Sequence, residues 1–380
     1  SKVKVNKMKP VIRNILRSAV YQLKYMDSVP DSAVCNEAVK LAVKKGFGTL
    51  RGFVNGVLRN VARGLDQVEY PAEGIERLSV VYSMPEWILK LWKKTYDLDV
   101  IESMLQAFQE ETQVTIRCNL AKTTPENLKE SLQKEGVTVT PHPYLSYAFW
   151  IQDYDHLSEL ESFQKGEFYV QDISSMLVGE LADPKKGDRV IDVCAAPGGK
   201  ALHVAEKLRG TGSVEARDLS LYKVGLITEN IERSGLMNIH AVQKDATVCD
   251  ADVKDAADLV IADLPCSGLG VLAKKTDLKY KATEQSTKEL AGLQRKILKN
   301  AASYVRPGGT LIYSTCTINP AENIENVHWF LKEFPEFVLD PIADRLCSTL
   351  QNSVEEAGCL QLLPGIHKSD GFFIARFGKK

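Results

Sequence analysis

Two cysteines in the second half of the sequence stand where nucleophilic chemistry is possible. Cys266 lies in Asp263–Gly268, which reads DLPCSG, and Cys316 lies in Ser314–Thr317, which reads STCT. Each segment follows a short apolar run typical of a buried strand, and we expect these strands to be neighbours in a parallel sheet. The carboxyl ends of the strands would then bring both thiols into one cleft. This placement favours a chemical role over burial as small apolar side chains.

The other cysteines show no disulfide or metal framework. The sequence has eight cysteines, with no CxxC pair and no dense, regular spacing, so we predict reduced thiols. We interpret four of them as small buried side chains: Cys35, Cys118, Cys347 and Cys359. No paired Cys or His spacing supplies the four ligands of a zinc ion, and we predict that the protein binds no metal.

A Gly-rich turn between an expected strand and an expected helix predicts a binding corner for a nucleotide-sized cofactor. Arg189–Lys200 reads RVIDVCAAPGGK, and Ala201–Leu208 resumes with helical spacing. Glycines let a ligand approach the backbone, and free N–H groups at a helix N-terminus face it. We expect the cofactor to contact the residues of this turn: Cys194, Ala195, Ala196, Pro197, Gly198, Gly199 and Lys200.

Carboxylates follow the next strands at the same sheet edge. Asp218 ends the second strand, where an acid commonly binds a ribose diol, and Asp245 ends the third, where a carboxylate could accept from an adenine amino group. Either residue alone is more often a helix cap or turn former, so the interpretation depends on their shared register. The APGG turn lacks the GxGxxG spacing of dinucleotide sites, which argues against a pyrophosphate. S-adenosylmethionine fits better, with Asp263 as a third carboxylate near it.

A thiol beside a sulfonium methyl group indicates methyl transfer to a pyrimidine. Carbon 5 of the ring is too weak a nucleophile to take the methyl group directly, but a thiolate that adds to carbon 6 creates an enamine with electron density at carbon 5. A base must then remove the carbon 5 proton before the thiol is eliminated, which explains the need for more than one functional group. Asp263 could hydrogen-bond the cytosine edge, stabilise the charge created by attack, and select cytosine over uracil.

The elements that would position these groups alternate regularly between strand and helix after residue 166. This alternation predicts a Rossmann-like α/β domain over residues 166–380, with a mostly parallel sheet covered by helices on both faces. Beyond the strand of the Gly-rich turn, we expect strands at Val214–Leu219, Ile239–Val242, Leu259–Ala262 and Thr310–Tyr313. A closing antiparallel hairpin is expected at Cys359–Leu363 and Phe372–Phe377. Ligands bind at the carboxyl ends of the strands in such sheets.

The N-terminal residues predict a basic bundle of helices. Apolar residues recur at helical spacing over Val11–Met26, Val34–Lys44 and Phe47–Ala62. Residues 1–63 carry thirteen Lys and Arg against three Asp and Glu, a net charge of +10, which leaves −11 on the remainder. Such a charge favours a polyanion partner or a solvated helical surface. Three helices are few for a self-contained core, so we expect the sequence to begin partway through a larger helical domain.

The sequence predicts three domains. We place the helical domain at residues 1–68, with a linker from Gly64 to Leu78, and a small α/β subdomain in the rest of residues 69–165. The third domain is the α/β domain of residues 166–380. At 380 residues and 44% hydrophobic content, the chain can bury a sizeable core. No apolar run is long enough to span a membrane and no signal peptide is evident, so we expect a cytoplasmic protein.

Three motifs together resemble a known enzyme family. DVCAAPGGK at Asp192–Lys200, DLPCSGLG at Asp263–Gly270 and STCTINPAEN at Ser314–Asn323 are similar to the signatures of RNA cytosine-5 methyltransferases. The N-terminal segments NEAV at Asn36–Val39 and GFVNGVLR at Gly52–Arg59 resemble part of a NusB-like RNA-binding domain. Together they resemble bacterial enzymes that act on small-subunit (16S) ribosomal RNA, over nearly the whole chain.

The resemblance implies roles for particular residues. Cys316 would be the nucleophile and Cys266 would assist release of the product, while Asp263 would bind the target base and Lys200 would lie beside the methionine tail or the base. The implied cofactor is S-adenosylmethionine and the implied partner is ribosomal RNA, with the protein acting as a monomer. Two alternatives remain open: a transfer RNA or DNA substrate, and a catalytically silent RNA-binding scaffold.

Overall fold

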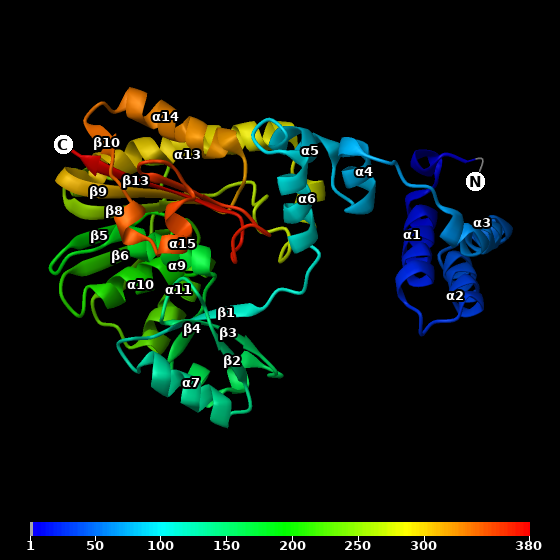
Figure 1. The fold of residues 1–380 in the computed structure, drawn as a ribbon, viewed down its shortest axis with the longest axis horizontal. Helices are drawn as coiled ribbons and strands as arrows, with labels where there is room; N and C mark the ends of the chain where they lie inside the picture. Colours follow the sequence, from blue (N-terminus) through cyan, green and yellow to red (C-terminus); the bar gives the residue numbers. More distant parts are fainter. Residues whose placement is uncertain (1–2) are drawn as a thin grey trace. The chain divides into compact units, whose positions relative to one another are not determined.

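The chain divides into two compact units. The computed structural model describes residues 3–380, apart from the side chains of Asp66 and Glu355. The first unit is Ser1–Ala72 and the second is Glu73–Lys380 (Figure 1). Within the described part of the chain, no helix is both long and apolar enough to cross a bilayer.

Three amphipathic helices build the described part of the first unit: α1 (Pro10–Tyr25), α2 (Asp31–Lys44) and α3 (Arg51–Gly64). Their apolar faces pack together, and Val54 and Leu58 of α3 are fully buried, because residues three to four positions apart share one face of a helix. The helical pattern therefore predicted this bundle correctly. Short 3-10 turns lie at Val5–Lys7, Gly48–Leu50 and Leu65–Gln67, the second in place of the expected start of the third helix.

The second unit opens with α4 (Gly74–Val81), α5 (Glu86–Trp92) and α6 (Leu98–Ala107). The expected linker up to residue 78 is wrong at its end, because α4 begins at Gly74 and its Leu78 is buried in an apolar core with α5 and α6. That core also contains residues from the loops that follow the two candidate cysteines: Leu269, Leu272 and Ile318. These helices therefore support the candidate site.

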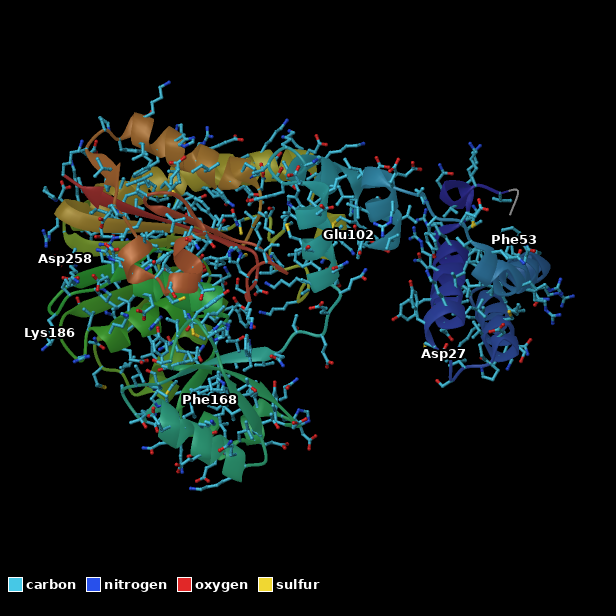
Figure 2. The ribbon with its side chains drawn as sticks, in the orientation of Figure 1. Asp27, Phe53, Glu102, Phe168, Lys186 and Asp258 are labelled. Atoms are coloured by element: carbon cyan, nitrogen blue, oxygen red, sulfur yellow. The ribbon has the colours of Figure 1, made fainter. Side chains whose placement is uncertain are left out.

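A small antiparallel sheet follows, in the strand order β2-β3-β1-β4. Its strands are β1 (Val114–Cys118), β2 (Thr138–Pro141), β3 (Ala148–Gln152) and β4 (Phe168–Val170). Helix α7 (Pro125–Lys134) covers one face, and Phe168, labelled in Figure 2, is fully buried in their common core. The sheet extends past residue 165, where we expected the small subdomain to end, because β4 pairs with β1. Short helical segments lie at Leu157–Glu159 and in α8 (Glu161–Gln164).

A buried ion pair joins the other face of this sheet to the larger domain. Arg117 of β1 is fully buried, with its Nη1 2.6 Å from Oε2 of Glu206 in α10 (Gly199–Lys207). The Nε of Arg117 donates to Gln171 Oε1 at 2.8 Å. The guanidinium also lies 4.4 Å from the centre of the Tyr169 ring. Because an unpaired buried charge is costly, this contact fixes the small sheet against α10.

The large sheet has the described order β11-β12-β13-β9-β8-β5-β6-β7, with β10 paired to β13. Its parallel strands are β5 (Arg189–Asp192), β6 (Ser213–Asp218), β7 (Ile239–Gln243), β8 (Ala257–Asp263) and β9 (Val305–Thr315). The antiparallel strands are β10 (Phe337–Leu339), β11 (Val354–Glu356), β12 (Cys359–Leu362) and β13 (Phe372–Lys379). The expected hairpin is therefore confirmed as β12 and β13, within a wider antiparallel side.

Helices cover both faces of the large sheet, as the alternation predicted. Helices α9 (Ile173–Ala182) and α10 pack on one face, and α13 (Glu284–Tyr304) and α14 (Ile324–Glu333) pack on the other (Figure 1). Alternate residues of β8 serve the two cores, since successive side chains of a strand point to opposite faces. The other helical segments are α11 (Leu221–Ser234), α12 (Leu278–Lys281), α15 (Ser348–Gln351), Ala251–Val253, Pro320–Glu322 and Ala343–Arg345.

Candidate active site

The two candidate cysteines lie side by side. The Sγ atoms of Cys266 and Cys316 are 3.3 Å apart, within hydrogen-bond distance for sulfur. Strands β8 and β9 are parallel neighbours, and Asp263 at the end of β8 is in register with Ser314 in β9. The loops that leave these strands therefore start at the same sheet edge. The expectation that the topology brings both thiols into one site is confirmed.

An acid and a lysine complete the group around the thiols. Lys200 in the first turn of α10 places its Nζ 2.7 Å from Oδ2 of Asp263, and Ser314 Oγ donates to Oδ1 at 2.7 Å. Burial disfavours the charged form of Lys200, but the carboxylate of Asp263 outweighs it and the pKa of Lys200 is raised. Lys200 is therefore a cation, and its Nζ also lies 5.4 Å from the centre of the Phe372 ring.

The surroundings make the two thiols unequal. The hydrogen bond with Cys266 lowers the pKa of Cys316, against burial and the charge of Asp263, and the charges of Lys200 and Lys275 act in the same direction as that bond. The same hydrogen bond, together with burial, raises the pKa of Cys266 well above its usual value. Cys316 is therefore the more acidic thiol of the pair, and Cys266 the less acidic one.

The Gly-rich turn lies against the end of β6. The N–H of Ala195 donates to the carbonyl of Arg217 at 2.7 Å, and the N–H of Ala196 donates to Oδ2 of Asp218 at 3.2 Å. Gly198, the residue that precedes α10, has φ of +108°, a conformation that L side chains rarely adopt. The predicted turn and the predicted acid of the second strand are thus brought together.

Asp245 occupies a different kind of position. It is exposed, and its Oδ1 accepts from the N–H of Thr247 at 2.8 Å and from the Thr247 hydroxyl at 2.7 Å. The turn-forming alternative that the sequence left open is therefore realised. The preceding residue, Lys244, donates its N–H to the carbonyl of Asp218 at 3.0 Å, so Asp245 lies beside the end of β6. Its contact with adenine stays a prediction.

The sequence reasoning assigned no role to Asp192, the last residue of β5. This side chain is fully buried, and Oδ1 accepts from the N–H of Cys194 at 3.3 Å, whereas Oδ2 has no partner within the described chain. Burial, and then the charge of Asp263, raises the pKa of Asp192 to about 7. A carboxylate in the apolar run VIDV was the available sign in the sequence, because an acid inside a buried strand needs a reason.

These groups fit S-adenosylmethionine. The ligand carries a ribose diol, an amino-acid tail and a positive sulfonium. This sheet edge offers the carboxylates of Asp218 and Asp192, and Oδ2 of Asp192 has no partner within the described chain. The small residues of the turn leave room for a nucleoside at the backbone. Burial and then the charge of Asp192 raise the pKa of the Cys194 thiol, which disfavours the reactive thiolate. We therefore assign Cys194 a role through its backbone in the turn, and not through its thiol.

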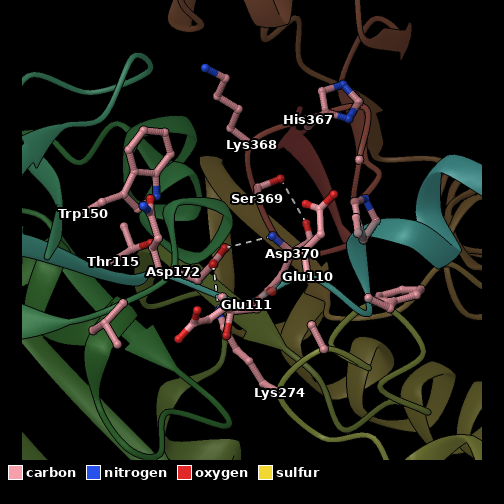
Figure 3. Close-up of a pocket in the computed structure, with 18 of the residues that line it drawn as sticks. Glu110, Glu111, Thr115, Trp150, Asp172, Lys274, His367, Lys368, Ser369 and Asp370 are labelled. Atoms are coloured by element: carbon pink, nitrogen blue, oxygen red, sulfur yellow. Dashed lines mark hydrogen bonds and ion pairs between the residues drawn. The ribbon is translucent and has the colours of Figure 1, made fainter. Parts of the chain in front are cut away.

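A cavity of about 890 Å³ lies beside this site (Figure 3). Its wall includes Trp150 of the small sheet and Lys274, whose Nζ lies 3.0 Å from Asp172 Oδ2 and 2.7 Å from Asp370 Oδ2. Burial, and then the charge of Asp172, raises the pKa of Asp370 to about 7. The volume is large enough for a nucleotide-sized group.

Backbone hydrogen bonds connect this cavity with the cysteines. The N–H of Gly371, which follows Asp370, donates to the carbonyl of Gly270 at 2.8 Å, and the N–H of Gly270 donates to the carbonyl of Cys316 at 3.1 Å. A side chain at Gly270 would place a Cβ 1.9 Å from the Gly371 carbonyl oxygen, so only glycine permits this approach. The cavity wall and the Cys316 loop are therefore directly connected through the backbone.

Comparisons with known proteins identify the parts of the chain. The model of the family described as 16S rRNA methyltransferase RsmB/F matches residues 180–378. A NusB family model matches residues 1–63, and a model of the ferredoxin-like domain of RsmF/B-like methyltransferases matches residues 84–154. The resemblance drawn from the motifs is confirmed for both the catalytic and the helical segments.

Relatives and solved structures agree with these matches. Proteins named probable ribosomal RNA small subunit methyltransferase B from Bacillus subtilis (strain 168) and Synechocystis sp. are 37% and 34% identical to this chain, covering 99% of it and 85% and 84% of their own lengths. The crystal structure of PH0851 has a TM-score of 0.84 at 27% identity and covers 100% of this chain and 84% of its own. The structure of NSun6 from Pyrococcus horikoshii with SFG has a TM-score of 0.69 at 25% identity, covering 79% of this chain and 99% of its own. The chain belongs to the 16S rRNA methyltransferase RsmB/F family.

Proposed function

We propose that this protein methylates carbon 5 of a cytosine in small-subunit ribosomal RNA through a covalent bond between Cys316 and carbon 6 of the base. As a family member it is an S-adenosylmethionine-dependent RNA methyltransferase. The observation that carries the proposal is the pair of sulfur atoms 3.3 Å apart beside the Lys200–Asp263 ion pair. A lone thiol would explain attack, but only a pair supplies both a nucleophile and a second acid–base group.

Cys316 begins the reaction as the thiolate of the pair. It adds to carbon 6, and the π electron pair of the C5–C6 double bond moves to carbon 5 and is delocalised over the rest of the ring. Carbon 5 thereby becomes nucleophilic. Asp263 would accept a hydrogen bond from the exocyclic amino group, which uracil lacks, and Lys200 would stabilise the negative charge on the ring. When bound, S-adenosylmethionine supplies an electrophilic methyl group for carbon 5.

Cys266 completes the cycle as a base. Bond formation at Cys316 removes the hydrogen bond and the neighbouring negative charge that keep a proton on Cys266. Cys266 then loses this proton to water and accepts the proton of carbon 5. As that C–H bond breaks, the C5–C6 double bond reforms and Cys316 leaves carbon 6 as a thiolate. This sequence explains why the two cysteines need different surroundings.

The proposal is tested with single cysteine variants. Cys316→Ala, Cys266→Ala and the control Cys347→Ala, a half-buried thiol outside the pair, are incubated with small-subunit ribosomal RNA and S-adenosylmethionine and run on a denaturing gel. We expect Cys266→Ala to trap a covalent protein–RNA adduct, Cys316→Ala to give neither adduct nor 5-methylcytosine, and the control to turn over normally. A reversed pattern would exchange the two roles, and full activity of both variants would refute the two-thiol mechanism.

We further propose that the basic helical unit holds the RNA that flanks the target base. Its exposed helix surface carries Lys44 and Lys45 at the end of α2, and phosphate contacts of this kind give salt-dependent affinity. The boundary at residue 68, the monomeric state and the cytoplasmic location stay predictions. Turnover on ribosomal RNA, transfer RNA and duplex DNA separates the substrates, and we expect ribosomal RNA to be the best of the three.

A further inference from the structure

A fully buried carboxylate, Glu322, joins the loops that carry the two cysteines. Its Oε2 accepts from the N–H of Ser267 at 2.8 Å and from Gln294 Nε2 at 3.0 Å. Its Oε1 accepts from the hydroxyl of Ser267 at 2.6 Å and from Asn319 Nδ2 at 2.9 Å. Ser267 directly follows Cys266, and Glu322 belongs to the 3-10 turn after the second cysteine loop. The carboxylate thus fixes one loop against the other.

The partners of Glu322 hold its side chain in one orientation. The Ser267 N–H and the side-chain amides of Gln294 and Asn319 can only donate to it, whereas the Ser267 hydroxyl also lies 2.7 Å from Thr317 Oγ1. The amide of Gln294 is fixed in this orientation, since its Nε2 also donates to the Pro265 carbonyl at 2.9 Å and its Oε1 accepts from Asn326 Nδ2 at 2.9 Å.

No cation neutralises this charge directly. Among the residues described, no Lys or Arg nitrogen forms an ion pair with Glu322. The hydroxyl of the buried Tyr313 donates to the backbone carbonyl of Glu322 rather than to its side chain. A buried negative charge without a counter-ion acts on nearby groups, because the protein interior screens it less than water does.

Different charged groups act on the two thiols. The charge of Glu322 opposes ionisation of Cys266, adding to the effects of the neighbouring thiol and of burial on its pKa. On the other side, Lys200 and Lys275 favour the thiolate of Cys316, while Asp263 opposes it. Since the two sulfur atoms share one hydrogen bond, a small difference in field decides which atom keeps the proton.

We propose that Glu322 is a positioning residue that keeps the shared proton of the thiol pair on Cys266 and the negative charge on Cys316. It acts mainly through its buried charge, and its hydrogen bonds to Ser267 hold that charge close to Cys266. The proposal rests on the proposed function only in that Cys316 is the nucleophile there. The distribution of the proton itself is a property of the free protein.

The test measures the reactivity of each thiol in Glu322→Gln, with neither RNA nor cofactor present. Iodoacetamide reacts with thiolates, and mass spectrometry of the digested protein gives the labelling rates of Cys266 and Cys316 between pH 6 and 9. In the unchanged protein we expect Cys316 to be labelled faster than Cys266. In Glu322→Gln we expect the ratio of the Cys316 rate to the Cys266 rate to fall about tenfold, the effect of one pKa unit of relative shift.

Matched variants separate charge from hydrogen bonding and from damage to the fold. Glu325→Gln removes an exposed carboxylate of α14 nearby and should leave the ratio unchanged. Glu322→Asp retains the charge and should restore most of the ratio, whereas Ser267→Ala removes a hydrogen bond but not the charge and should stay near the unchanged protein. If Glu322→Gln does not fold, the labelling ratios of Glu322→Asp and Ser267→Ala test the proposal in its place.

Two results would overturn the proposal. One is an unchanged ratio in folded Glu322→Gln. The other is a loss in Ser267→Ala as large as in Glu322→Gln, or a full loss in Glu322→Asp, because either would show that the charge is not decisive. A protein that labels as expected but forms no 5-methylcytosine would refute the proposed function and leave this inference intact.

Discussion

Replacing Asp192 by Asn should change how the stability of the second unit depends on pH. Burial and the charge of Asp263 raise the pKa of Asp192 to about 7, from an ordinary 3.8. The neutral carboxyl is thus favoured in the folded state, so its contribution to stability is complete below pH 4 and is lost as the pH rises through 7. At 1.4 kcal/mol per pKa unit, the loss is about 4 kcal/mol in total, of which about 3 kcal/mol falls between pH 5 and pH 8.

Asparagine keeps an oxygen for the N–H of Cys194 and has no ionised form. The free energy of unfolding of Asp192→Asn, relative to the unchanged protein, should therefore rise by about 3 kcal/mol from pH 5 to pH 8. Urea denaturation followed by tryptophan fluorescence measures this, since the tryptophans all lie in the second unit: Trp87, Trp92, Trp150 and Trp329. The exposed Asp155→Asn is the control and should show no such trend.

A constant difference between Asp192→Asn and the unchanged protein across this pH range would refute the reasoning. It would mean that Asp192 is already ionised in the folded state at pH 5, so that its pKa is not raised above that value. A neighbouring cation such as Lys200 that stabilises the carboxylate more than burial destabilises it would give this result, because Asp192 would then be ionised in both states over the whole range.

Two further changes test the supports of the site. Gly198→Ala should destabilise the protein by about 1–2 kcal/mol and weaken S-adenosylmethionine binding in calorimetry, because φ is +108° at this residue. The control Gly225→Ala in α11 should have neither effect, and equal affinity of the two variants for S-adenosylmethionine would contradict this prediction. Arg117→Met should cost about 3–5 kcal/mol by leaving Glu206 buried without a counter-charge, and adding Glu206→Gln should recover much of that loss in urea denaturation. Equal destabilisation in the single and double variants would argue against the ion pair.

Periodicity predicted the elements that bury only one face. The helices of the first unit were found in this way, because a polar face alternates with an apolar one. The strands of the large sheet, which are covered on both faces, were found as short apolar runs. Helix α9 was missed, since eight of its ten residues are buried and no polar face marks it. Strands β4, β10 and β11 are three residues long, too short for a pattern. Their pairing depends on partners far away in the sequence.

The site was predicted as far as strand ends and motifs allow. Strand order placed Cys266 beside Cys316, and that pairing needed only the parallel topology. The sequence patterns did not predict the other contacts between distant segments. Arg117 meets Glu206 across 89 positions, and Ser267 meets Glu322 across 55, with no local pattern that links them. Such contacts follow from tertiary packing, which cannot be inferred from local patterns in a single sequence.

The distinct roles of the two cysteines illustrate this limit. By sequence, Cys266 and Cys316 are equivalent thiols at adjacent strand ends, and only the family resemblance assigned their roles. In the folded chain, Asp263, Lys200 and Lys275 act on the pKa of Cys316, whereas the buried Glu322 acts on the pKa of Cys266. Different charges on the two sides of a shared hydrogen bond favour one position of the proton. We infer that Glu322, which lies outside the proposed substrate contacts, helps to set which thiol reacts first, so variants of Glu322 should alter that order before they alter RNA binding.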